Sequence, residues 1–453
     1  LASAERAHVA THFDLPVLYV VPDSFTLSLM YKRIKGFCPT AKVLEPKDDL
    51  LIYRKAFQQS RIAERLRLLD EVRRGEVGAL VTTPQALAEY YPSPSRLSKA
   101  IIGLKVGDER DITALADSLV EAGYVRESAA EEKSTFSISG DTLTIYPPYE
   151  DLPCRISFWG DEIESIKIFD IDSMITVRDI DSVNIYPCND LLVSEKEWED
   201  AVAAAKAACV KECAAGRERR DEILQALIEA GSRDQSAQWL SPYLKRGRAS
   251  VFEYLSDNWL IALEEDGQIL DKLRLFLSEH MARVDDLRAE GEALKAHKDC
   301  VMGESEIIEA MSGYTQIGLF NITSTARIVK PEALFKMKCS PVSDYTLSYR
   351  ALYEDLKSYR RGGIGVVMCM GDKRTARAIS ESLRSEDIAC VCGDDIDGAP
   401  SLNVTSYPLA HGVGYPQSKL VIIGRDDVIR RSDAAKVRAR NRAPFVIPKV
   451  GDY

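Results

Sequence analysis

The stretch from Phe136 to Asp170 constrains the fold most, because its apolar residues alternate with the period of two that is typical of half-buried strands. Gly140-Asp141 and the proline-rich segment from Pro147 to Pro153 supply the residues that turns need. The pattern therefore predicts three strands joined by hairpins.

One aromatic side chain falls on the polar side of the third predicted strand. Cys154, Ile156 and Phe158 share one face of this strand, and the other face carries Arg155, Ser157 and Trp159. Trp and Arg are enriched at the centres of protein interfaces. Two interpretations stay open: Arg155 and Trp159 form a binding surface, or another part of the same domain covers Trp159.

Length and charge exclude several classes of protein. The chain has 453 residues, which predicts three or four domains. Its net charge of -11 argues against a dedicated nucleic-acid binder, so any DNA contact would need a local basic patch. No apolar run is long enough for a membrane span, and the first residues lack the order of a signal peptide. Because residue 1 is Leu, we expect the natural start upstream.

Before and after this stretch, buried strands alternate with helices, which predicts α/β architecture. The first part reads as helices at 1–15, from about 25, at 53–75 and at 85–90, with strands at 16–21 and 79–82. A helix at 112–123 joins the central strands, which continue through 176–177 and 183–187, in a small α+β domain.

The second half predicts a helical segment and another α/β unit. Ser194 and Glu197 form a capping box, and long helices follow to about Ala230. The run from Trp259 to Asp266 predicts a buried strand that ends in acids. Further predicted helices are 266–296, 347–360 and 373–384, and further strands are 315–321, 364–369, 388–392, 402–407 and 420–424. A basic linker follows at 426–442.

Residue patterns give no argument for catalysis. The chain has no Gly-Lys dipeptide and so no P-loop, and it has no GxSxG elbow. Glu264 and Glu265 stand at a strand end, where an ATPase holds Mg²⁺ with an acidic pair. Without a P-loop to bind a nucleotide, these acids have nothing to act on. The segment from Gly371 to Thr375 predicts a helix cap, with a weak anion site as the alternative. Among the histidines, His8, His12 and His411 read as core-edge or loop residues.

The ten cysteines are scattered and form no CxxC pair. Cys209 and Cys213 are four residues apart on a predicted helix, and Cys390 and Cys392 share a face of a predicted strand, but no histidine stands at ligand spacing near either pair. The sequence therefore predicts reduced thiols that act as small apolar residues, and no metal site.

Several of these residues resemble a known family. The segments Leu104–Glu109, Phe136–Asp170 and especially Phe158–Ile166 look like domain 2 of the bacterial transcription-repair coupling factors (Mfd). The nucleotide-excision-repair protein UvrB is related in the same region. The order of the other units is also similar.

The resemblance implies an α/β multidomain fold: a degenerate, helicase-like (UvrB-like) parallel-sheet domain with an inserted small α+β domain, followed by a further small α/β domain. The implied boundaries are 1–103 for domain 1a, 104–188 for domain 2, 189–325 for domain 1b, 340–425 for domain 3 and 426–453 for a linker to an RNA-polymerase-interacting domain. It places the P-loop position just before Leu1. Only Tyr53 and Phe57 stand in the region from Val43 to Ile62 where UvrB carries an aromatic-rich hairpin, which favours a coupling factor over UvrB.

For the binding surface, the resemblance implies recruitment of UvrA by two arginines and one aromatic residue on one face of domain 2. The matching positions are Ser139, Arg155 and Trp159. Ser139 departs from the family pattern, in which arginine is common, so one charge-assisted contact worth about 1.5–3 kcal/mol is absent.

For the whole protein, the resemblance implies an ATP-driven translocase on double-stranded DNA that displaces stalled RNA polymerase, with ATP and Mg bound in domains beyond Tyr453. A C-terminal domain would mask domain 2 until the motor engages. We expect this chain to be cytoplasmic, monomeric and non-catalytic, without a cofactor or membrane partner. The rival interpretations are a UvrB-like ATPase that binds damaged DNA, and a domain 2 that has lost UvrA because of Ser139.

Overall fold

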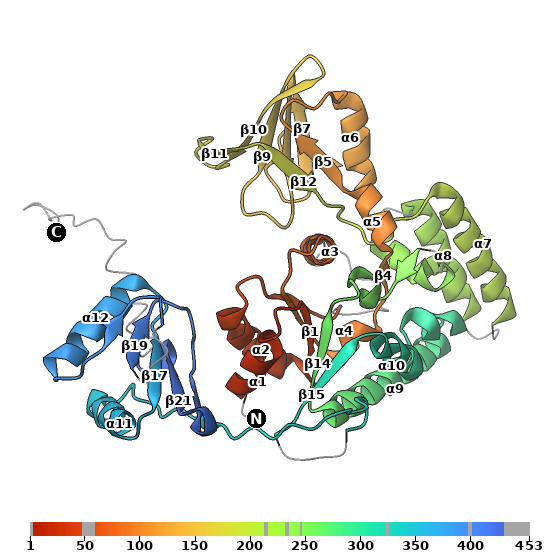
Figure 1. The fold of residues 1–453 in the computed structure, drawn as a ribbon. Coiled ribbons are helices and arrows are strands. Elements are labelled where there is room, and N and C mark those ends of the chain that lie inside the picture. Colours follow the sequence, from red (N-terminus) through yellow and green to blue (C-terminus); the bar gives the residue numbers. More distant parts are fainter. Residues whose placement is uncertain are drawn as a thin grey trace, which may run out of the picture.

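A computed structural model describes residues 3–47, 59–212, 216–231, 235–244, 247–321, 326–396 and 401–429. Three sheet-containing units are visible in Figure 1. We call them the first unit, the inserted unit (residues 102–188) and the C-terminal unit (residues 340–429). The first unit consists of the described residues before and after the inserted unit, up to residue 321. The fold is therefore mixed α/β with several small domains, as the sequence predicted.

The first unit is built on a five-stranded parallel sheet in the order β15-β14-β1-β3-β2. β1 lies between β3 and β14, so strands from both sides of the inserted unit meet in one sheet. The strands are β1 (Val17–Val20), β2 (Lys42–Leu44), β3 (Ala79–Thr82), β14 (Leu260–Glu264) and β15 (Thr315–Leu319). The continuous apolar runs of β1 and β3 follow from burial on both faces of the sheet.

Helices cover both faces of this sheet. One face packs against α1 (Ser3–Thr11) and α2 (Ser24–Phe37). The side chain of Asp23 caps the first turn of α2. The other face packs against α3 (Gln59–Arg73), α4 (Pro84–Ala88), α5 (Pro94–Ala100), α9 (Asp266–Glu290) and α10 (Glu304–Ser312).

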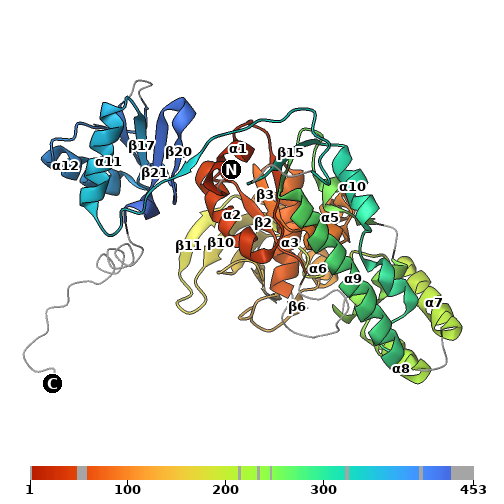
Figure 2. The ribbon, with the colours of Figure 1, turned by 90° about the horizontal axis from the view of Figure 1, so that it is seen from below.

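A helical subdomain extends the first unit. The predicted capping box of Ser194 and Glu197 opens α7 (Glu195–Lys211), which packs against α8 (Arg217–Ala230). Figure 2 shows this pair and the C-terminal unit at opposite ends of the molecule. The remaining short elements of the first unit are β4 (Tyr91–Pro92), β13 (Arg248–Ala249), η1 (Gln235–Tyr243), η2 (Val251–Tyr254) and η3 (Lys295–Cys300).

Two predicted helices were too long. The helix expected at 1–15 ends at Thr11, and Asp14 beyond it adopts φ +51°. The helix expected at 266–296 ends at Glu290, because Gly291 adopts φ +79°, and a separate 3-10 turn follows. A Cβ at Gly291 would lie 2.4 Å from the backbone oxygen of Gly216. Glycine therefore allows both the left-handed backbone and the close approach of the two chain segments.

The inserted unit has a six-stranded sheet in the order β11-β10-β9-β8-β7-β6. Its inner face packs against α6 (Ile112–Glu121) through a cluster that includes Leu119, Phe136 and Ile156. The strands are β6 (Val125–Arg126), β7 (Thr135–Ser139), β8 (Thr142–Tyr146), β9 (Cys154–Trp159), β10 (Glu162–Phe169) and β11 (Thr176–Ile180). The chain enters and leaves the unit through a second, two-stranded sheet of β5 (Ile102–Lys105) and β12 (Ser182–Ile185).

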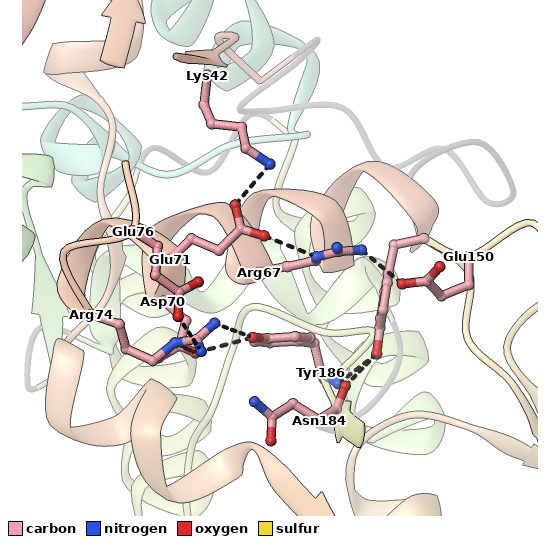
Figure 3. A network of polar contacts seen from close by, with 10 residues as sticks. Lys42, Arg67, Asp70, Glu71, Arg74, Glu76, Glu150, Asn184 and Tyr186 are labelled. Atoms are coloured by element: carbon pink, nitrogen blue, oxygen red, sulfur yellow. Dashed lines mark hydrogen bonds and ion pairs between the residues drawn. The ribbon is translucent and has the colours of Figure 1, made fainter. Parts of the chain in front are cut away.

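Polar contacts join the inserted unit to α3 of the first unit (Figure 3). Tyr186 donates a hydrogen bond to Asp70 Oδ2 at 3.0 Å, and Arg67 Nη1 pairs with Glu150 Oε1 at 2.8 Å. Burial and then the Asp70 carboxylate raise the pKa of Tyr186 to about 12, so the phenol keeps its proton at neutral pH. These contacts fix the side of the inserted unit that faces α3.

The C-terminal unit has a six-stranded sheet in the order β16-β20-β21-β17-β19-β18. α11 (Tyr349–Arg361) and α12 (Lys373–Ser385) pack on one face of it. On the other face, Leu409 and Val367 pack against Phe37 of α2. The strands are β16 (Ser340–Pro341), β17 (Gly365–Cys369), β18 (Val391–Cys392), β19 (Leu402–Thr405), β20 (Val413–Tyr415) and β21 (Leu420–Gly424), with the short turns η4 (Pro416–Ser418) and η5 (Arg425–Asp427).

The strand predicted at 388–392 was also too long, since β18 begins at Val391. The backbone N–H of Ile388 donates to Leu383 O at the end of α12, so it is used to close the helix. Cys390 therefore precedes the strand that was expected to carry it.

The other sequence expectations can be compared only within the described residues. There, the nine cysteines form no disulfide, and no helix is long and apolar enough to cross a membrane. Cys213, the region of Tyr53 and Phe57, and the basic linker from residue 430 onward lie outside them.

Candidate partner-binding surface

The outer face of the inserted unit's sheet turns away from α6. Strand register places side chains of neighbouring strands in rows on this face. One row contains Ser139, Thr142, Ser157 and Ser165, and the next contains Arg155, Lys167 and Asp179. The alternation predicted for the third strand is confirmed, since Cys154, Ile156 and Phe158 are buried on the inner face.

Trp159 is the most exposed aromatic side chain of this face, at 79% of its area. It is the last residue of β9, directly before a tight turn in which Gly160 adopts φ +62°. The alternative that another part of the domain covers Trp159 is therefore wrong. A large apolar side chain held in solvent on a rigid strand is available to a partner.

Arg155 is half-buried and lies four residues before Trp159 on the same strand. Its guanidinium carbon lies 4.3 Å from the centre of the Phe169 ring. Within the described part of the chain, no hydrogen bond or ion pair involves its guanidinium. The group is thus desolvated on one side by an aromatic ring and keeps its N–H donors for another molecule.

Ser139 ends β7 and is exposed. It pairs with Thr142, which pairs in turn with Ser157, so Ser139 lies level with the middle of the Arg155–Trp159 segment. Two strand spacings put it about 10 Å from β9. The three residues named from the sequence therefore lie on one face, although Ser139 contributes only a neutral hydroxyl.

Phe169 was not predicted as part of this surface. The alternation of the sequence could have indicated it. Ile166 and Ile168 face inward, so Phe169, like Trp159, is a large aromatic residue on the polar side of its strand. It is 3% exposed and does not belong to the cluster that fills the inner face.

The acidic residues at the end of β14 all have partners inside the protein. Arg6 of α1 forms ion pairs with Glu264 and Glu265, and Tyr19 donates to Glu264 Oε2 at 2.8 Å. Burial and then Glu264 hold the pKa of Tyr19 well above its usual value, so it remains a donor. The sequence analysis did not name Arg6 as the partner of these two acids.

Asp266, the next residue, is fully buried. Its Oδ2 accepts backbone hydrogen bonds from Arg327, Ile328 and Val329 at 2.7, 2.7 and 3.1 Å. The carboxylate thus holds residues 327–329 against the start of α9.

The remaining candidates have local roles in the fold. Asp372 caps α12 by accepting from Thr375 N at 2.8 Å, and this bond lowers the pKa of the Asp372 carboxyl. His411 contacts Asp427 at 2.9 Å, and His8 stacks on Phe37 at the edge of the core. Across the described ranges, no group of three or more His, Cys, Asp or Glu side chains could hold a metal ion.

Comparisons with known proteins single out the same unit. Residues 102–191 match the UvrB interaction domain family. The resemblance predicted from the sequence is confirmed. The chain is 23% identical over 411 residues to a transcription-repair-coupling factor of Bacillus subtilis, which covers 86% of this chain and 34% of that protein.

Two further relatives match over about half of the chain. A transcription-repair-coupling factor of Myxococcus xanthus is 30% identical over 217 residues, 47% of this chain and 18% of that protein. A UvrABC system protein B of Thermotoga petrophila is 28% identical over 215 residues, 44% of this chain and 32% of that protein. This chain spans about a third of the length of the coupling factor from Bacillus subtilis.

Proposed function

We propose that this chain recruits UvrA, as the N-terminal part of a transcription-repair coupling factor, and that this recruitment serves nucleotide excision repair at RNA polymerase stalled by a lesion. The exposed face of Arg155 and Trp159 carries the proposal, because it lies within the segment that matches the UvrB interaction domain. Trp159 supplies the apolar contact, Arg155 supplies the charged contact, and Ser139 lies at the rim.

The geometry of the surface is suitable for a protein partner. A buried Trp removes on the order of 150–200 Å² from water, which corresponds to about 4 kcal/mol before the costs of association. Trp159 is already fixed on a strand, and Arg155 is already held on a ring, so both lose little conformational freedom on binding. Neighbouring serines and threonines can form the polar rim around such a centre.

The assignment of the units follows from the same proposal. Residues 1–103 and 189–325 would be the helicase-like domains 1a and 1b, 104–188 domain 2, 340–425 domain 3 and 426–453 a linker. The intact protein would be cytoplasmic and monomeric, would bind RNA polymerase and double-stranded DNA through further domains, would hold ATP and Mg there, and would mask domain 2 with a C-terminal domain until the motor engages.

We assign no catalytic role to this chain. The pairing of Arg6 with Glu264 and Glu265 supports this assignment, because an internal guanidinium occupies the acids that a UvrB-like ATPase would use for Mg²⁺. ATP turnover by the purified chain that disappears in a Glu264→Gln variant would contradict it and favour the ATPase alternative.

Binding of the 453-residue chain to purified UvrA by biolayer interferometry tests the recruitment. We expect Trp159→Ala and Arg155→Glu each to weaken binding at least thirtyfold, which corresponds to about 2 kcal/mol at an interface centre. Arg178→Glu, on the opposite face of the same sheet, and Tyr407→Ala, an exposed aromatic of the C-terminal unit, are matched controls. Equal binding by all four variants and the wild type would reject the surface.

A further inference from the structure

Phe169 is buried on a face that no helix of the inserted unit covers. Its strand pairs with β11 through a bulge between Ile168 and Phe169, where the partner register moves from Arg178 to Thr176. Its backbone N–H donates to Pro153 O at 3.2 Å, which keeps this end of β10 attached to the chain entering β9. The backbone of Phe169 is therefore fixed at this end of β10, and its ring lies on the outer face, one row beyond the row of Arg155, Lys167 and Asp179.

The register explains why Arg155 lies on this ring. Arg155 is directly opposite Lys167, and two positive charges on directly opposed residues repel each other. Phe169 is two residues further along β10 and is the diagonal neighbour of Arg155, within reach of a long side chain. Repulsion from Lys167 and attraction to the ring act in the same direction, while Asp179 lies opposite Lys167 on its other side.

We propose that Phe169 is a positioning residue for partner binding: its ring holds the Arg155 guanidinium flat, so that the free N–H edge of Arg155 can pair with a carboxylate of the partner. The inference rests on the proposed recruitment of UvrA, and it names the chemistry of the contact, an Asp or Glu side chain bound in two-point fashion. A guanidinium presents its paired donors in one plane, so fixing that plane fixes the direction of approach of the carboxylate.

Comparison of ring-bearing and ring-free variants separates positioning from simple packing. Phe169→Leu removes the ring but keeps an apolar side chain, and Phe169→Tyr keeps the ring face. Each is combined with Arg155→Ala in a double-mutant cycle, and Kd for purified UvrA is measured by biolayer interferometry. Circular dichroism and thermal unfolding identify any variant that has lost its fold.

We expect Phe169→Leu to raise Kd about tenfold, and Phe169→Tyr to keep Kd within about threefold of the wild type. In the Arg155→Ala background, Phe169→Leu should have no further effect, because the ring then has nothing to position. The benefit of the ring should depend on the planar guanidinium and not on charge alone, so Arg155→Lys, which keeps the positive charge, should lose it.

Three results would overturn the inference. If Phe169→Leu binds UvrA as tightly as the wild type, the ring is not needed. Equal losses from Phe169→Leu with and without Arg155 show that the ring acts through the sheet and not through Arg155. A wild-type chain that fails to bind UvrA refutes the proposed function itself, and the positioning role with it, and so differs from the first two results.

Discussion

Replacement of Arg6 by Met tests whether the ion pairs at the end of β14 hold α1 against the sheet. Arg6 and Glu264 are 3% and 5% exposed, so Arg6→Met leaves the buried Glu264 carboxylate without the guanidinium that pairs with it. Removal of one partner from a buried pair destabilises a protein by about 3–5 kcal/mol. Tyr19 still donates one hydrogen bond to Glu264, which places the expected loss near the lower end, at about 3 kcal/mol.

Urea unfolding at pH 7.5, followed by circular dichroism, measures this loss. The penalty comes from an unpaired charge, so it should shrink in the double variant Arg6→Met/Glu264→Gln, which has no carboxylate at position 264. Arg350→Met is the matched control, because Arg350 pairs with Glu354 at 3.2 Å in full solvent and should cost less than about 0.5 kcal/mol. An Arg6→Met variant as stable as this control at pH 7.5 would refute the reasoning.

Three further predictions concern affinity, pH and backbone geometry. Ser139→Arg should lower Kd for UvrA about tenfold in the same interferometry assay, because it adds a charged donor level with Ser157 on the outer face. Burial lowers the pKa of His297 to about 4. The free energy of unfolding should therefore be unaffected by His297 above about pH 6.5 and should fall by roughly 3 kcal/mol as the pH drops from there through 4. Urea titrations at several pH values should show this fall in the wild type and a flatter profile in His297→Gln. Gly291→Ala should cost about 2–4 kcal/mol in urea unfolding, since φ is +79° and Gly216 is adjacent.

The residues on the outer face of β9 were predictable from sequence, because the alternation of a strand decides which side chains share a face. Once residues 154–159 form a strand, a period of two places Arg155, Ser157 and Trp159 together. The buried strands at 17–20, 79–82 and 260–264 were predictable for a related reason, since continuous apolar runs are typical of parallel strands covered on both faces. In both cases the information is local.

Contacts that depend on register or tertiary packing were not predictable. The diagonal relation between Arg155 and Phe169 requires the pairing of β9 with β10, which alternation alone does not specify. Arg6 and Glu264 are 258 residues apart, and only the position of α1 against the sheet brings them together. The ends of α9 and β18 were misplaced because a left-handed glycine and a helix-closing hydrogen bond interrupt otherwise continuous patterns.

The residues that stabilise the first unit and the residues proposed to bind UvrA lie in different sheets. The ion pairs of Arg6 belong to the sheet of the first unit, whereas Arg155, Phe169 and Trp159 belong to the sheet of the inserted unit, which joins the first unit through α3. Residues far apart without shared partners contribute independently to stability and binding. Arg6→Met should therefore lower stability while leaving Kd for UvrA unchanged below the unfolding transition, and Trp159→Ala should do the reverse. A loss of UvrA binding by folded Arg6→Met protein would show that the first unit itself contributes to the contact.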